Sequence, residues 1–196
     1  MHSYNGAVHR EDQILDAAEK LFSERSFDGV GVDAIGKGAG VSGSAIYRHF
    51  SSKDEILAAL FDRVIDKLLL RVGEPADDPH EELARLIDAH IDFAVDHPRL
   101  ADIWIREQRA LTRPHMRKHL RRERIYTDLW LNALRNRYPD RPASDLRATM
   151  RAVHSLITSD ATRPSSSTRP VQLKILLRIL AYSALQGLDV SREHSA

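Results

Sequence analysis

The chain has 196 residues and carries 29 Lys and Arg against 28 Asp and Glu, which gives a formal net charge of +1 at pH 7. This balance excludes the strongly basic class of nucleic-acid-binding proteins, so any binding to DNA has to rest on a local patch. The sequence contains no cysteine, which excludes disulfides and thiolate metal sites. With 42% hydrophobic residues and no apolar run near the roughly 20 residues that span a bilayer, we expect a globular, cytoplasmic protein without membrane association.

Helical periodicity begins at Arg10 and recurs to the end of the chain, whereas residues 1–9 are polar and are expected to be irregular. No stretch alternates with period two for long enough to indicate a strand. The sequence therefore predicts an all-α fold of about nine helices, with a flexible polar connector at 163–170. The expected helices cover residues 10–26, 32–39, 42–49, 52–72, 79–96, 98–106, 115–138, 144–158 and 171–187. We expect two domains, a three-helix head at residues 8–54 and a second helical domain at residues 55–196.

The segment from Gly40 to Phe50 has the spacing of a helix-turn-helix. Gly40 tolerates the left-handed backbone that a short turn requires, and Ser42 can cap the next helix. The second helix of such a motif commonly reads the major groove of DNA. Seven apolar residues are expected to form the core of the head: Leu21, Phe22, Phe27, Ile35, Val41, Ile46 and Phe50.

Two further helix starts have recognisable chemistry. Ser52 and Glu55 match the capping box, in which the two side chains satisfy each other's backbone amides. Pro79 suits the first turn of the fifth helix.

From Gly29 to Leu57 the sequence resembles the TetR family of one-component bacterial transcriptional repressors. The resemblance rests on order and spacing: Phe27, Val32-x-x-Ile35, Ala39-Gly40-Val41-Ser42, Ile46-Tyr47-x-x-Phe50 and Ser52-Lys53-Asp54-Glu55. It implies a homodimer joined through the last two helices and an effector cavity in the middle helices. Three positions depart from the family pattern: Gly31 lacks a capping hydroxyl, Ser26 stands where glycine often ends the first helix, and Gly36 stands where alanine is usual.

The residues expected to contact DNA lie at the start and outer face of the third helix. From Ser42 to Lys53 there is no acidic residue, which suits a surface that faces phosphates. Tyr47 and Arg48 can reach base edges or phosphates, and Lys53 is placed for a phosphate. The predicted set is Ser42, Gly43, Ser44, Tyr47, Arg48, His49 and Lys53.

Two apolar seams with the same spacing run along the last two helices. Paired seams suit a four-helix arrangement across a twofold axis, although they can also pack inside one subunit. The predicted dimer interface consists of Leu146, Met150, Val153, Ile157, Leu173, Leu177, Leu180 and Ala184.

Large apolar and aromatic residues in the middle helices suit an effector cavity, with a few polar groups to orient a ligand, although each can equally be plain core. The predicted ligand set is Phe93, Trp104, Arg106, Arg109, Leu111, Tyr126, Trp130, Met150 and His154, with Ile105, Leu134, His90 and Glu107 as further candidates.

A run of six basic residues is faced only by Glu123: Arg113, Arg117, Lys118, Arg121, Arg122 and Arg124. It is either a solvated helix face or a phosphate site, as for a CoA thioester whose acyl chain enters the cavity. His115 and His119 have the spacing of a shared metal site, but neighbouring cations and the lack of a third ligand argue against one. We expect no metal and no cofactor.

The favoured interpretation is a ligand-responsive regulator that binds a palindromic DNA operator as a homodimer and is released by a small, partly apolar effector. An adaptor without DNA contact remains an alternative. An enzyme is the weakest one, because the sequence has no phosphate loop or nucleophile motif.

Overall fold

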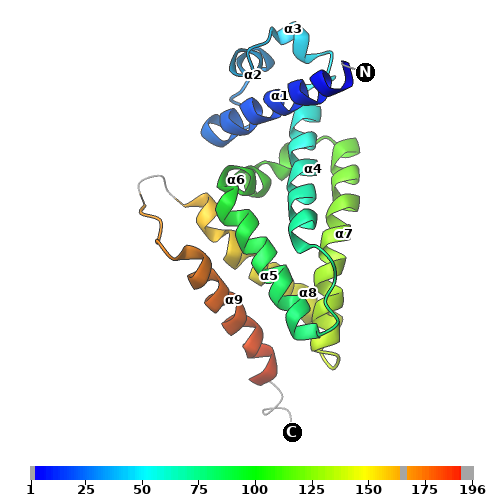
Figure 1. The fold of residues 1–196 in the computed structure, drawn as a ribbon, viewed down its shortest axis with the longest axis vertical. Coiled ribbons are helices and arrows are strands. Elements are labelled where there is room, and N and C mark those ends of the chain that lie inside the picture. Colours follow the sequence, from blue (N-terminus) through cyan, green and yellow to red (C-terminus); the bar gives the residue numbers. More distant parts are fainter. Residues whose placement is uncertain (1–2, 164–166, 191–196) are drawn as a thin grey trace. The chain divides into compact units, whose positions relative to one another are not determined.

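The computed structural model describes residues 3–163 and 167–190. These residues form nine α-helices and two short 3-10 helices and contain no strand, which confirms the all-α prediction (Figure 1). The elements are α1 (Ser3–Arg25), α2 (Val32–Gly38), α3 (Gly43–Ile46), α4 (Lys53–Val72), α5 (Pro79–Asp96), α6 (Pro98–Glu107), η1 (Gln108–Ala110), α7 (Arg113–Arg137), α8 (Ala143–Thr158), η2 (Ser159–Thr162) and α9 (Leu173–Val190).

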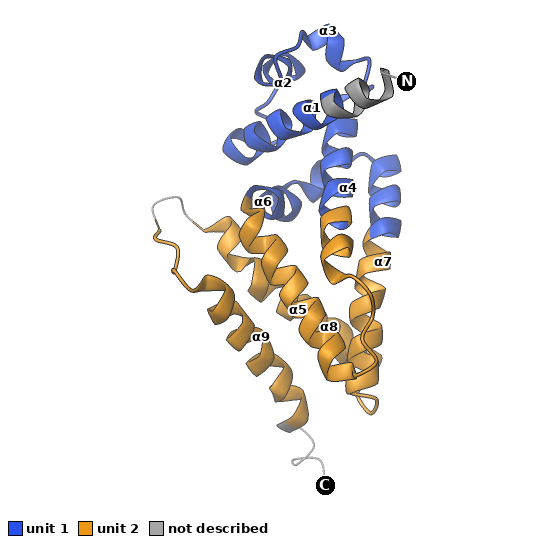
Figure 2. Ribbon diagram, in the orientation of Figure 1, with its two compact units in different colours: residues 1–65, 99–122 blue, residues 66–98, 123–196 orange. Residues whose placement is uncertain are grey.

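The chain forms two compact units (Figure 2). Unit 1 contains residues 1–65 and 99–122, and unit 2 contains residues 66–98 and 123–196. The division falls inside α4 and inside α7, so unit 1 holds α6 and the first part of α7 in addition to the expected head. The expected boundary at residue 54 coincides with no gap in packing, and its role as a domain boundary stays a prediction.

In unit 1, α1, α2 and α3 pack on one another around an apolar core. Phe22, Ile35 and Ile46 are no more than 1% exposed, as expected, and the rings of Phe22 and Phe27 lie 5.4 Å apart. Leu21 and Val41 are only half-buried. The turn before α3 has Gly40 at φ +69°, in the left-handed conformation that glycine accepts without strain.

Capping explains where several helices begin. The Ser42 hydroxyl accepts a hydrogen bond from the Ala45 amide at 3.2 Å, as predicted. At α4 the predicted capping box is half right: Ser52 Oγ accepts from the Glu55 amide, but the Glu55 carboxylate accepts from the amide and hydroxyl of Ser51. Those two hydrogen bonds lower the pKa of Glu55.

Three expectations about element bounds are wrong. Helix α1 begins at Ser3, although residues 1–9 were expected to be irregular. Helix α3 ends at Ile46, and residues 47–49 form turns instead of completing the expected helix to His49. The short helices η1 and η2 were not foreseen, because three or four residues are too few to show a periodic pattern.

In unit 2, α9 packs on both α5 and α8. Its buried face consists of Leu173, Leu177, Ala181 and Leu185, each no more than 6% exposed. Ion pairs between Lys174 and the carboxylates of Asp92 (2.7 Å) and Asp96 (2.9 Å) fix the side of α9 that faces α5. Among the helices of the described ranges, none is long and apolar enough to cross a membrane.

Candidate DNA-binding surface and effector site

The predicted DNA-contacting residues of α3 and the turn after it form a mostly exposed surface in unit 1. Ser42, Ser44, Tyr47 and Arg48 are exposed, and the Tyr47 side chain reaches 57%. Ile46 and Phe50 point the other way, into the core. The helix-turn-helix therefore presents hydroxyl, phenol and guanidinium groups outward, which are groups that contact bases and phosphates.

Two members of the predicted set are held inside the head. The Lys53 ammonium donates to the carbonyls of Phe27 (2.9 Å) and Val30 (3.0 Å) and lies 4.1 Å from the centre of the Phe27 ring. These contacts fasten α4 to the α1–α2 turn and give Lys53 a structural role, while its contact with a phosphate stays a prediction. His49 is half-buried with Nδ1 3.5 Å from the Glu11 carboxylate.

The α1–α2 turn is also held by the end of α6. Glu107 accepts a hydrogen bond from the Phe27 amide at 3.2 Å, and Arg106 donates to the Ser23 carbonyl at 3.2 Å. Arg106 also pairs with Asp102, which raises the pKa of the guanidinium. Sequence reasoning assigned Arg106 to an effector. Its contacts instead join α6 to α1.

The predicted effector residues fall into two groups, one in each unit. In unit 1, the Trp104 ring lies 5.3 Å from Phe61 and 4.6 Å from His119, and Leu111 is buried while Arg109 is exposed. In unit 2, Phe93 and Met150 are buried, and Tyr126, Trp130 and His154 come together. Ile105 is 42% exposed and does not line a core.

The group in unit 2 has a fourth member, His90, and we call these four residues the histidine cluster. The rings of His90 and His154 are stacked, with centroids 4.3 Å apart and planes 13° from parallel. His90 Nδ1 lies 2.8 Å from the Tyr126 hydroxyl, and Trp130 is fully buried against the edge of His154.

Burial lowers the pKa of His90 to about 4 and raises that of Tyr126. The pKa of His154 is also lowered, by burial and by the neighbouring His90. Both imidazoles are therefore neutral at pH 7.

The predicted dimer seams are largely used inside the chain. Leu146, Met150, Val153 and Ile157 of α8 are between 1% and 8% exposed, and Leu173 and Leu177 of α9 are also buried. These six side chains have little surface left to bury against a partner, so in the single chain they act as intramolecular core, and their place in a dimer interface stays a prediction. Leu180 is 43% exposed and Ala184 is also exposed.

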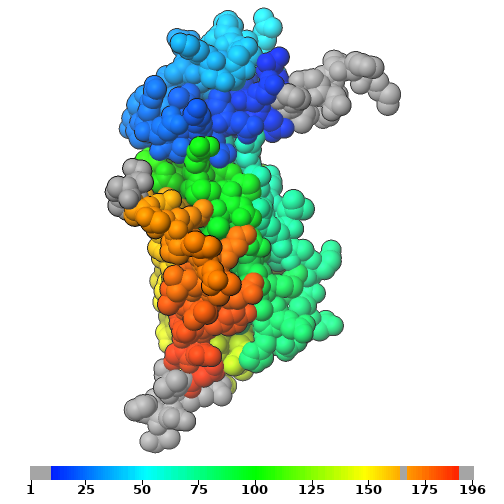
Figure 3. Space-filling model, turned by 60° about the vertical axis from the view of Figure 1, so that its left-hand side comes forward, coloured from blue at the N-terminus to red at the C-terminus, as the bar shows by residue number. Residues whose placement is uncertain are grey.

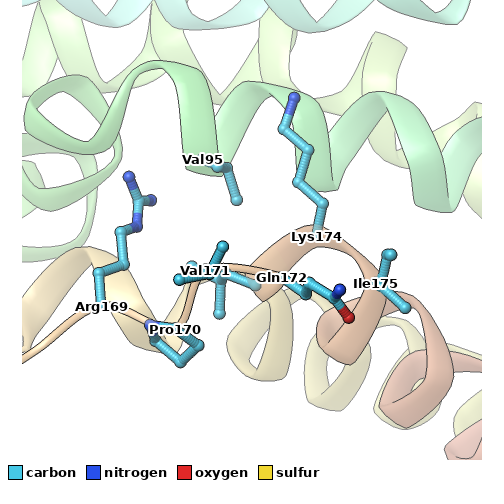
Figure 4. A pocket seen from close by; sticks show the side chains of 8 residues that line it. Val95, Arg169, Pro170, Val171, Gln172, Lys174 and Ile175 are labelled. Carbon is cyan, nitrogen blue, oxygen red and sulfur yellow. The ribbon is translucent and has the colours of Figure 1, made fainter.

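A different face of α9 lies uncovered at the surface (Figure 3), and its exposed residues are largely apolar. We call this the outer α9 face, and its apolar members are 43–102% exposed: Val171, Ile175, Leu176, Ile179 and Leu180. At the start of α9 it continues into a groove of about 400 Å³ that Val171 and Ile175 line together with Val95 and Pro170 (Figure 4). Contiguous exposed apolar surface of this kind marks interaction sites.

The basic run of α7 is divided by its contacts. Lys118 and Arg122 both pair with Asp62, at 2.8 and 3.2 Å. The exposed arginines that make no ion pair within the described part of the chain are Arg113, Arg117, Arg121 and Arg124. His115 and His119 belong to no cluster of three or more metal-ligating side chains in residues 3–163 and 167–190.

Comparison with known proteins assigns the chain to a family. Residues 14–60 match the model of the bacterial regulatory proteins of the tetR family, and residues 76–161 match a tetracyclin repressor-like C-terminal domain. The transcriptional activator FasR of Mycolicibacterium smegmatis is 33% identical over 110 residues, which are 55% of this chain and 50% of FasR. The repressor KstR2 of Mycobacterium tuberculosis is 28% identical over 129 residues, 64% of each protein. The chain thus spans half to two thirds of the length of these two relatives.

Solved structures agree at the level of the fold. The structure of KstR2 superposes with a TM-score of 0.75 at 22% identity, over 91% of this chain and 94% of that one. AibR, solved in complex with isovaleryl coenzyme A and operator DNA, gives a TM-score of 0.75 at 19% identity, over 87% and 97% of the two chains. The relatives named here are transcriptional regulators and not enzymes. The two family-model matches, over residues 14–60 and 76–161, and the shared fold show that this chain belongs to the tetR family of bacterial transcriptional regulators.

Proposed function

We propose that the protein is a ligand-responsive transcriptional regulator of the cytoplasm that binds a palindromic DNA operator as a homodimer. The observation that carries this proposal is the exposed surface of Ser42, Ser44, Tyr47 and Arg48, which a capped turn and a buried Ile46 hold outward. Lys53 supports this surface from behind by fastening α4 to the α1–α2 turn.

A homodimer is proposed because one head offers few cations to DNA. Of the two cations between Ser42 and Lys53, only Arg48 is free for a phosphate or a base edge. Because DNA affinity grows with the number of phosphates neutralised, two heads on one duplex are needed for tight binding. The outer α9 face is the surface proposed to join the two copies, in place of the seams predicted from sequence.

The effector is proposed to be a small, partly apolar molecule received among the buried aromatic residues, and an acyl-CoA is the specific candidate. In the unit that holds the histidine cluster, the exposed Arg124 offers a phosphate a guanidinium group that makes no ion pair within the described residues. The complex of AibR with isovaleryl coenzyme A shows that a protein with this fold takes such a ligand.

Selection from random double-stranded DNA followed by gel shift tests the function. The wild-type protein is expected to enrich a palindrome, and Tyr47→Ala and Arg48→Ala are expected to weaken its binding by at least about tenfold each. Arg135→Ala, which removes an exposed arginine of unit 2, is the matched control and should bind as the wild type does. Enrichment of no sequence, or normal operator binding by folded Tyr47→Ala and Arg48→Ala proteins, contradicts the proposal.

The same gel shift tests the effector. Isovaleryl-CoA is expected to release the operator, whereas free coenzyme A is not. Operator binding that no acyl-CoA changes removes the acyl-CoA candidate and leaves the DNA-binding function standing.

A further inference from the structure

The histidine cluster has buried polar atoms that the protein itself does not satisfy. Three nitrogens of the cluster, Nε2 of His90, Nε2 of His154 and Nε1 of Trp130, are inaccessible to solvent and have no hydrogen-bond partner among the described residues. A buried donor or acceptor left unpaired costs about 1–3 kcal/mol, so an apolar core of the same shape would be more stable. Three such atoms in a single cluster, two of them on stacked rings, indicate that a group from outside the chain completes them.

The contact with Tyr126 determines which kind of atom His90 presents. A phenol hydroxyl is a stronger hydrogen-bond donor than an imidazole N–H, and an unprotonated imidazole nitrogen is the stronger acceptor. Tyr126 therefore donates to Nδ1 of His90 across the 2.8 Å contact. In a neutral imidazole the hydrogen then lies on Nε2, so His90 presents a donor and requires an acceptor.

The surroundings determine the charge of that acceptor. The rings that contact His90 are those of Tyr126, Trp130 and His154, none of which is a cation at neutral pH. A carboxylate buried among them would lack a counter-ion, which is far more costly than burying a neutral oxygen. An uncharged carbonyl oxygen meets both requirements.

We infer that the effector of this regulator carries an uncharged carbonyl group, as in a ketone, ester or thioester, and that His90 Nε2 donates a hydrogen bond to its oxygen. The inference rests on the proposed function, since it assigns the head group of the same effector. His154 stacks on His90 and offers a second nitrogen, and Tyr126 is a positioning residue that fixes the tautomer of His90.

The test compares three small probes: the ketone butyrophenone, the hydrocarbon butylbenzene and the carboxylate 4-phenylbutyrate. Calorimetric titration of the full-length protein at pH 7.5 is expected to show butyrophenone binding about tenfold tighter than either of the others, as one hydrogen bond to a buried donor provides. In ¹⁵N spectra of the imidazoles, butyrophenone is expected to shift the Nε2 resonance of His90.

The variant for this test replaces both hydrogen-bonded partners, His90→Phe with Tyr126→Phe, so that no hydroxyl is orphaned by the change. It is expected to bind the ketone and the hydrocarbon within about twofold of one another. His80→Phe makes the same imidazole replacement at an exposed position of α5 and should keep the wild-type preference. The inference is overturned if the wild type does not prefer the ketone, if it binds none of the probes, or if the double variant retains the preference.

A gel shift with the selected operator separates this failure from that of the proposed function. A protein that binds its operator and is released equally by butylbenzene and butyrophenone is still an effector-controlled regulator, but its effector is not selected by a carbonyl. A protein that binds no operator fails at the level of the proposed function.

Discussion

Gly36 is a position where the sequence interpretation was correct about the residue and wrong about its consequence. From the sequence, glycine at this position, where alanine is usual in the family, costs at most about 1 kcal/mol of helix stability. In the structure, a Cβ at this position would lie 2.9 Å from the Val41 carbonyl oxygen and 3.1 Å from the Gly43 amide nitrogen. Both are backbone atoms of the turn that leads into α3. Glycine therefore allows the reading segment to pack closely against α2.

Replacing Gly36 with alanine is expected to push this turn away from α2. The predicted cost is about 1–3 kcal/mol of unfolding free energy, because backbone has to move to admit the methyl group. Operator binding should fall as well, since Ser42 to Arg48 follow the displaced turn. Urea denaturation and gel shift measure the two effects.

Gly31→Ala is the matched control for this prediction. A Cβ at Gly31 has no atom within 4 Å, and the backbone there is extended at φ −91°. The reduced freedom of the unfolded chain and the weaker helix cap oppose one another, so its stability should stay within about 1 kcal/mol of the wild type. Equal stability of the two variants would contradict the close-approach explanation.

At the scale of the elements, periodicity and capping located every described α-helix to within a few residues, except the start of α1. The sequence could not show the early end of α3, because residues 47–49 continue a helical pattern while the chain already turns toward Phe50. It also could not show which of two apolar faces of α9 is used inside the chain. Leu173 and Leu180 share one predicted seam, yet Leu173 is 6% and Leu180 43% exposed.

The buried face of α9 is the one that packs on α5 and α8, and long-range ion pairs at the edge of this contact accompany the choice. Arg178 pairs with Asp88 at 2.7 Å, and Lys174 pairs with two aspartates of the same helix, α5. These partners lie about 80 to 90 positions earlier in the sequence, so the seam spacing in α9 contains no information about them. The DNA-contacting residues were easier to predict because the helix-turn-helix is local.

The outer α9 face gives a prediction about assembly. Ile179→Glu places a charge in the middle of this face, where the wild-type side chain is 57% exposed, and is expected to convert a dimer into a monomer. The change should not disturb the fold, because Ile179 is not part of the buried seam. Light scattering at micromolar concentration measures the mass in solution.

Leu70→Glu is the control for that prediction, since Leu70 is 82% exposed on α4 and away from α9. It should leave the dimer intact. A wild-type protein that is already monomeric, or an Ile179→Glu protein that still dimerises, would rule out the outer α9 face as the interface.

At the scale of the whole molecule, each of the two units keeps neutral histidine in its interior. Unit 1 contains the buried His119, and unit 2 contains the buried His90 and the half-buried His154, whose Nε2 is inaccessible to solvent. Burial lowers the pKa of all three, with the Asp62 charge opposing this shift at His119. The cluster proposed to receive the effector is thus also one of the places where the folded chain responds to acid.

Stability is therefore expected to fall as the pH drops from about 6.5 toward 4. The pKa of His90 is 6.5 when unfolded and about 4 when folded, so in this window the unfolded chain binds more protons. His90 alone would account for about 3 kcal/mol, at 1.36 kcal/mol per unit of pKa.

The carboxylates with lowered pKa, Glu55 and Asp96, lose their contributions only near and below their ordinary values of 4.5 and 3.8. Burial raises the pKa of Asp88 and Glu123, so these two carboxyls oppose the loss as the pH falls, and urea denaturation between pH 7.5 and 5 reports the histidines against them. The His90→Phe, Tyr126→Phe double variant should show a shallower dependence, and His80→Phe should follow the wild type. A free energy of unfolding that stays constant from pH 7 to pH 5 would mean that these imidazoles are solvated or already protonated in the native protein. His90 would then not be the neutral donor that selects a carbonyl.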